Sequence, residues 1–158
     1  MRAEEPTVRP LGTARHRAKY LPGSGAAKAS AMLGTRNVMA FLATTNPERA
    51  KAFYGDTLGL PLVSDEPWAL VFSAAGTMLR VQKVEKHTPH PFTALGWYVP
   101  DVADDVGALA SRGVRFERYE GLQQDDAGVW TSPSGAKVAW FKDPDGNMLS
   151  LTEDAPLP

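Results

Sequence analysis

The order of predicted elements repeats within the chain, and this repeat constrains the fold more than any other sequence feature. Each half begins with a short apolar run, continues with an amphipathic helix and ends with three strand-like runs. The predicted helices cover residues 46–58 and 101–112. The predicted strands cover residues 38–43, 60–64, 68–73 and 78–84, and then 94–99, 114–119, 137–141 and 148–152. We therefore expect two similar modules in one chain.

Both helices have clear start and stop signals. Asn46 and Asp101 are residue types that cap helix N-termini, and Pro47 suits the first helical position. Gly59 and Gly113 follow the last apolar position of each helix, where a left-handed residue ends the helix. The same signals in both halves support the repeat.

The second half is longer than the first. Asn46 and Asp101 are 55 positions apart, whereas the turn glycines Gly76 and Gly146 are 70 apart. The extra 15 residues fall in the polar, turn-rich segment 120–135. This insertion is interpreted either as a functional rim or as a passive surface loop.

Two motifs resemble those of the vicinal oxygen chelate superfamily, which includes glyoxalase I, extradiol dioxygenases and the bleomycin- and fosfomycin-resistance proteins. One is the run from Glu48 to Tyr54 that leads to Leu58 and Gly59, and the other is residues 140–147, WFKDPDGN. The resemblance covers residues 36–153. It implies an α+β fold with two paired βαβββ modules, whose curved sheets surround a cavity.

The resemblance also implies a domain organisation. We expect a single domain over residues 35–153, with module one at 36–85 and module two at 93–153. Residues 1–34 are predicted to form a flexible arm because they lack an apolar period, and residues 154–158 a tail. Met32 is an alternative start of the working domain.

In metal-using members of this superfamily, four inward-facing positions on the first and last strand of each module hold the ion. The resemblance places Met39, Arg80, Ala94 and Ser150 at these positions. None supplies the imidazole nitrogen or carboxylate oxygen that such ions prefer, and Arg80 adds a fixed positive charge. We therefore predict no metal ion and no cofactor at these positions.

Two histidines offer the alternative metal ligands. His87 and His90 have a spacing that can chelate, but Pro89 and Pro91 exclude a helix that would align both rings. A solvated linker between the modules is the competing interpretation.

Strand alternation predicts which side chains line the cavity. Arg80 would bind an anionic or enolate-like group if unpaired, or would form an ion pair, for example with an acid of the insertion. Trp130 is interpreted as core or as a lid over a ligand, whereas Trp97 and Trp140 are expected to pack under the helices. The predicted ligand-binding residues are Met39, Phe41, Arg80, Gln82, Tyr98, Trp130 and Ser150.

Composition excludes several function classes. The chain has no cysteine, so disulfides and thiolate chemistry are excluded. Residues 35–158 carry a net charge of −5, which argues against nucleic-acid binding as the main role. No apolar run approaches the ~20 residues of a membrane span, and no secretory signal is recognisable. We expect a cytoplasmic homodimer.

The leading functional hypothesis is metal-independent binding or sequestration of a small molecule, similar to the resistance proteins. The alternative is a glyoxalase-type lyase or isomerase, or a dioxygenase, with a non-standard metal site or none. In the metal-free form, Arg80 would stabilise an oxyanion while Tyr98 or Ser150 moves a proton. No catalytic residue is assigned.

Overall fold

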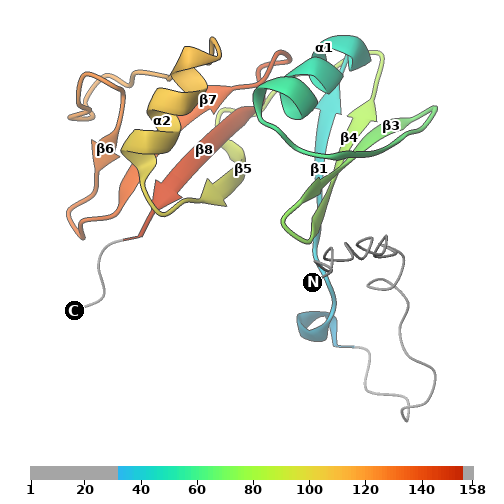
Figure 1. The fold of residues 1–158 in the computed structure, drawn as a ribbon, viewed down its shortest axis with the longest axis horizontal. Coiled ribbons are helices and arrows are strands. Elements are labelled where there is room, and N and C mark those ends of the chain that lie inside the picture. Colours follow the sequence, from blue (N-terminus) through green and yellow to red (C-terminus); the bar gives the residue numbers. More distant parts are fainter. Residues whose placement is uncertain (1–31, 155–158) are drawn as a thin grey trace, which may run out of the picture. The chain divides into compact units, whose positions relative to one another are not determined.

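A computed structural model describes residues 32–154 of the chain (Figure 1). Leu33–Thr35 form a single 3-10 turn, η1, and the described residues from Asn37 onward form one compact unit. Most of the expected arm, residues 1–34, and of the tail, residues 154–158, lies outside the described residues. Among the described helices, none is long and apolar enough to cross a membrane.

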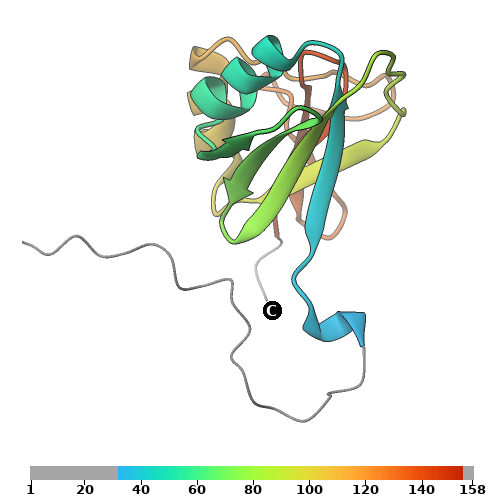
Figure 2. The ribbon, with the colours of Figure 1, turned by 90° about the vertical axis from the view of Figure 1, so that its right-hand side faces the viewer.

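The first module folds in the predicted order. The sheet order is β1-β4-β3-β2, with β1 parallel to β4 and the other pairs antiparallel (Figure 2). The side chain of Asn46 accepts a hydrogen bond from the Arg49 amide, as expected of an N-cap. The elements are β1 (Met39–Thr44), α1 (Pro47–Lys51), its π-helical continuation η2 (Ala52–Thr57), β2 (Leu62–Asp65), β3 (Ala69–Ala74) and β4 (Thr77–Lys83).

The second module has the same topology, with sheet order β5-β8-β7-β6 and β5 parallel to β8. Asp101 accepts a hydrogen bond from the Asp104 amide and caps the second helix. The two open four-stranded sheets confirm the α+β fold with two βαβββ modules. The elements are β5 (Thr93–Tyr98), α2 (Val102–Ser111), β6 (Trp130–Thr131), β7 (Lys137–Lys142) and β8 (Met148–Glu153).

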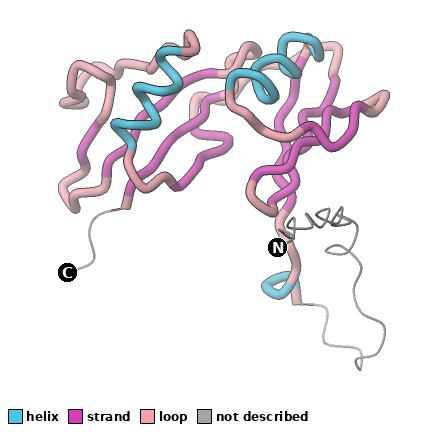
Figure 3. The backbone as a smooth tube through the Cα atoms, in the orientation of Figure 1, coloured by secondary structure: helices cyan, strands magenta, loops and turns pink. Residues whose placement is uncertain are grey.

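The predicted strand over residues 114–119 is wrong. This segment makes only an isolated bridge, from Phe116 to Phe141, and the edge strand β6 lies inside the insertion instead. The physical reason is the side chain of Gln124, which accepts a hydrogen bond from the Tyr119 amide and donates to the Glu117 carbonyl. These backbone groups are therefore bonded to an amide side chain rather than to a strand. Figure 3 shows most of segment 120–135 as loop.

Each sheet buries one face under its helix. Leu79 and Val81 on β4, and Phe141 and Leu149 on β7 and β8, are fully buried in one continuous apolar core. Alternate residues of the same strands point to the opposite face, which is here called the open face of each sheet. The predicted cavity residues must be sought on these open faces.

The turn between β7 and β8 joins the two modules through buried polar contacts. The Tyr54 hydroxyl donates to Asp143 Oδ2 at 2.7 Å, and Asn147 Nδ2 donates to the Ala43 carbonyl at 2.9 Å. Burial and the neighbouring Asp143 charge raise the pKa of Tyr54, so its hydroxyl remains a donor. The motif WFKDPDGN thus carries a contact between modules as well as a turn.

Asp145 adds a second link between the modules. Its carboxylate accepts hydrogen bonds from the Thr44 hydroxyl at 2.5 Å and the Thr45 amide at 2.7 Å. Partial burial alone would raise the pKa of Asp145, but these hydrogen bonds outweigh it and hold the pKa below the usual 3.8. The ionised carboxylate therefore stabilises the folded state.

Tyr54→Phe removes the donor to Asp143 and leaves the ring in place. We expect a loss of about 1.5–3 kcal/mol in the free energy of unfolding, because a buried carboxylate loses a hydrogen bond. Urea unfolding measures this change. Tyr98→Phe is the matched control because the Tyr98 side chain is 80% exposed, and it should leave stability unchanged. Equal effects of the two variants would contradict the role of the Tyr54 bond.

Asp145→Asn tests the second link through its pH dependence. A carboxyl whose folded pKa is lowered stabilises the fold above its unfolded pKa of about 3.8 and loses this contribution as the pH falls through the folded value. We expect the variant to be less stable than the parent protein at pH 7, with the difference shrinking below pH 3.8. Unfolding free energies measured from pH 7 to pH 2.5 check this. A difference between variant and parent that does not change with pH would contradict the role of the Asp145 carboxylate.

Candidate functional site: the open faces of the two sheets

The predicted cavity residues are divided between the two sheets. On the first sheet, Phe41 lies beside Arg80 in the β1–β4 register, and Gln82 lies two residues further along β4. On the open face of this sheet, Met39 and Phe41 keep 42% and 54% of their surface exposed. The first sheet therefore presents an apolar surface with a cation at its centre.

The second sheet carries the other predicted residues. Ser150 on β8 lies between Gly96 on β5 and Trp140 on β7. Tyr98 lies at the end of β5 and is largely exposed. The register of β5 shifts between Thr93 and Leu95, which leaves Ala94 out of the pairing with β8. Ala94 is therefore a bulge residue rather than a regular strand position.

Arg80 forms an ion pair, and its partner is not an acid of the insertion. Its guanidinium lies 3.6 Å from Glu66, which precedes β3, and both side chains are about one-third exposed. The Ser64 hydroxyl donates a hydrogen bond to the same carboxylate and helps to place it. Over residues 32–154, Arg80 Nε is the one buried side-chain nitrogen or oxygen without a hydrogen-bond partner. Arg80 is thus paired and still has a donor to offer.

An aromatic cluster on the second sheet was missed by the sequence reasoning. The rings of Trp130 and Trp140 lie 6.1 Å apart, and those of Tyr119 and Trp140 lie 5.5 Å apart in an edge-to-face arrangement. Trp140 was predicted to pack under a helix, and this is wrong. The buried neighbours Ala139 and Phe141 face α2, so alternation along β7 turns Trp140 to the open face.

Two further aromatic residues of the second module, Trp97 and Tyr119, lie in different environments. Trp97 packs against the core and stacks on Phe141 at 6.5 Å, which confirms its predicted place under the helix. The Tyr119 hydroxyl lies 3.3 Å from the sulfur of Met148. Desolvation, with a smaller contribution from the charge of Glu117, raises the pKa of Tyr119 and keeps the phenol neutral.

The residues at the four family metal positions do not fit an ion. Methionine, arginine, alanine and serine side chains supply neither imidazole nor carboxylate. Within residues 32–154, no three His, Cys, Asp or Glu side chains form a group that could hold a metal ion. His87 instead makes a 2.7 Å hydrogen bond with Asn147, and His90 stacks on Phe92.

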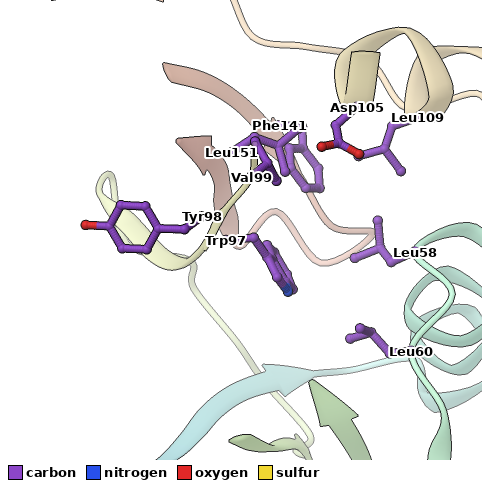
Figure 4. Close-up of a pocket in the computed structure, with 9 residues that line it drawn as sticks. All are labelled: Leu58, Leu60, Trp97, Tyr98, Val99, Asp105, Leu109, Phe141 and Leu151. Carbon is purple, nitrogen blue, oxygen red and sulfur yellow. The ribbon is translucent and has the colours of Figure 1, made fainter. Parts of the chain in front are cut away.

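A small pocket lies on the helix side of the sheets, and of the predicted ligand-binding residues only Tyr98 lines it (Figure 4). Leu58 and Leu60 of the first module face Trp97 and Leu109 of the second across a volume of about 190 Å³. The side chain of Tyr98 points away from the others. This volume is below the range of about 300–1,000 Å³ typical of ligand pockets.

Comparison with solved structures supports the fold assignment. A superfamily member from Sphaerobacter thermophilus is 25% identical, with a TM-score of 0.60 over 75% of this chain and 96% of that one. TnmS3, an antibiotic binding protein from a Streptomyces species, is 24% identical, with a TM-score of 0.58 over 77% and 97%. Lactoylglutathione lyase from Agrobacterium tumefaciens is 19% identical, with a TM-score of 0.58 over 75% and 93%.

Comparison of the sequence with curated proteins finds no match. The model of one protein family matches residues 36–151, which is most of the chain and runs from before β1 into β8. The chain therefore belongs to the Glyoxalase/Bleomycin resistance protein/Dioxygenase superfamily.

Proposed function

We propose that this protein binds a small organic molecule on its open sheet faces without a metal ion at the four family positions. The observation that carries the proposal is the set of side chains at these positions, Met39, Arg80, Ala94 and Ser150. A cation placed there would meet a guanidinium instead of a carboxylate. The exposed apolar side chains around Arg80 suit an organic ligand better than an ion.

The proposed ligand site comprises the residues predicted from the sequence together with the aromatic cluster. On the first sheet the site includes Met39, Phe41, Arg80 and Gln82. On the second sheet it includes Tyr98, Trp130 and Ser150. An anionic group of the ligand would compete with Glu66 for Arg80, whose Nε already lacks a partner within the described residues. A binding role on this fold has a precedent in the neighbour TnmS3, described as an antibiotic binding protein.

A lyase, isomerase or dioxygenase activity has less support. The neighbour from Agrobacterium tumefaciens is a lactoylglutathione lyase, but its TM-score equals that of the antibiotic binding protein, so the fold does not discriminate. A non-standard metal site would need His87 or His90, and their rings contact Asn147 and Phe92. Binding is therefore the function that these side chains support best.

The metal-free proposal is tested by elemental analysis. The purified protein is equilibrated with Zn²⁺, Ni²⁺ or Mn²⁺, desalted and analysed, and we expect far less than one ion per chain. The matched control is the quadruple variant Met39→His, Arg80→Glu, Ala94→His, Ser150→Glu, which supplies two imidazoles and two carboxylates. The control should retain about one ion per chain if the four positions converge.

Two outcomes would contradict the proposal. One is a stoichiometric ion in the parent protein. The other is a folded quadruple variant, verified by circular dichroism, that retains no ion, because the four positions would then not share a site.

We further propose that one domain, residues 35–153, carries this function in the cytoplasm as a homodimer, with residues 1–34 as an accessory arm. Support comes from the exposed apolar side chains of Val38, which precedes β1, and of Met39 and Phe41 on β1. β1 and β5 are also edge strands of their sheets, and a second copy could cover such edges.

Light scattering at micromolar concentration measures the assembly directly. We expect twice the mass of the 17.1 kDa chain, independent of concentration over the micromolar range. A mass of one chain throughout this range would count against the homodimer, while the ligand-binding proposal would stand.

A further inference from the structure

The second sheet presents a continuous aromatic surface on its open face. Trp140 lies in the middle, with Tyr119 edge-on at 5.5 Å and Trp130 tilted at 6.1 Å. All three side chains are half-buried, and none belongs to the apolar core under α2. They share the face that carries Ser150, because Ser150 is the direct cross-strand partner of Trp140.

Hydrogen bonds hold the rings in place. The Trp140 indole nitrogen donates to the Thr93 hydroxyl at 3.2 Å, and the Tyr119 hydroxyl contacts the sulfur of Met148. Trp130 lies opposite Val138 in the short β6–β7 ladder. Rings fixed in this way lose little conformational freedom when a ligand binds, which favours recognition of a rigid flat molecule.

Ser150 supplies a polar group beside these rings. The residue is only 6% exposed, and its cross-strand neighbours are Gly96 and Trp140. A Cβ at position 96 would lie 2.6 Å from the Ser150 oxygen, so Gly96 leaves the space into which this hydroxyl points. A serine hydroxyl at this place can donate a hydrogen bond to, or accept one from, a polar substituent of a ligand.

We propose that the face formed by Tyr119, Trp130 and Trp140 binds a flat aromatic ring system whose hydrogen-bonding substituent reaches the Ser150 hydroxyl. This inference rests on the proposed small-molecule function and names the chemical class of the ligand. Aromatic rings attract one another through their quadrupoles beyond what buried area alone provides. A saturated ring of the same size lacks this contribution, so the site distinguishes flat aromatic molecules from aliphatic ones.

The inference also gives the insertion a role. Trp130 lies within segment 120–135, and Tyr119 directly precedes it. Gln124 bonds the backbone of Glu117, Tyr119 and Gly128, which fixes the start of the insertion relative to the aromatic face. The segment that breaks the symmetry between the modules thus supplies one of the three rings and directly follows a second.

The experiment compares 2-naphthol with decahydro-2-naphthol, which has the same carbon framework and hydroxyl but no aromatic ring. Titration calorimetry on the full chain should show about tenfold tighter binding of 2-naphthol. Trp130→Leu should remove about tenfold of the affinity for 2-naphthol and little of that for the saturated probe. Ser150→Ala should weaken binding of both probes about fivefold, because both carry the hydroxyl.

Trp68→Leu is the matched control. Trp68 precedes β3 in the first module and is 68% exposed, so the same substitution there should leave both affinities unchanged. In the unmutated protein, NMR provides a readout that needs no variant. The indole N–H signals of Trp130 and Trp140 should shift on addition of 2-naphthol, and that of Trp68 should not.

Equal affinity for the two probes, or equal losses in Trp130→Leu and Trp68→Leu, would overturn the aromatic site while small-molecule binding stands. Binding of neither probe also overturns the aromatic site. In that case native mass spectrometry of protein purified from its own host, searching for a retained small molecule, tests the proposed function separately.

Discussion

The carboxylate of Asp143 lies buried between the two modules, and the rest of the domain depends on how its charge is satisfied. It accepts hydrogen bonds from the Tyr54 hydroxyl, the Asn147 side chain, and the backbone amides of Asp145 and Asn147. An uncompensated charge at this depth would cost several kcal/mol. Because Tyr54 comes from the first module, the turn after β7 is fully satisfied only when both modules are in place.

This constraint reaches the candidate site through the strands that the turn connects. Asn147 also donates to the Ala43 carbonyl in β1, so the end of β1 and the start of β8 are held together. Three residues further along, β8 places Ser150 on the open face between Gly96 and Trp140. The motif WFKDPDGN therefore positions the strands of both modules, and the chemistry of the site comes from the side chains on their open faces.

Local signals in the sequence were enough to predict the repeat, both helix caps and the face of Trp97, because each depends on residues close in the chain. The failures involve long-range partners. The expected strand at 114–119 does not form, because the side-chain amide of Gln124 hydrogen-bonds the backbone groups of Glu117 and Tyr119. Alternation on β7 could have placed Trp140 correctly once Phe141 was recognised as core. Nothing local indicated that Arg80 would meet Glu66.

The two modules share a fold and differ in what their open faces offer. The first sheet presents Met39 and Phe41 around the Arg80–Glu66 pair, whereas the second presents three clustered aromatic rings and a buried serine. A metal site of the family type draws matching ligands from both modules, which keeps the two halves chemically alike at those positions. Without matching ligands at these positions, each face is free to recognise a different part of a molecule. If the protein binds a small molecule as proposed, this asymmetry between the modules is the basis of its selectivity.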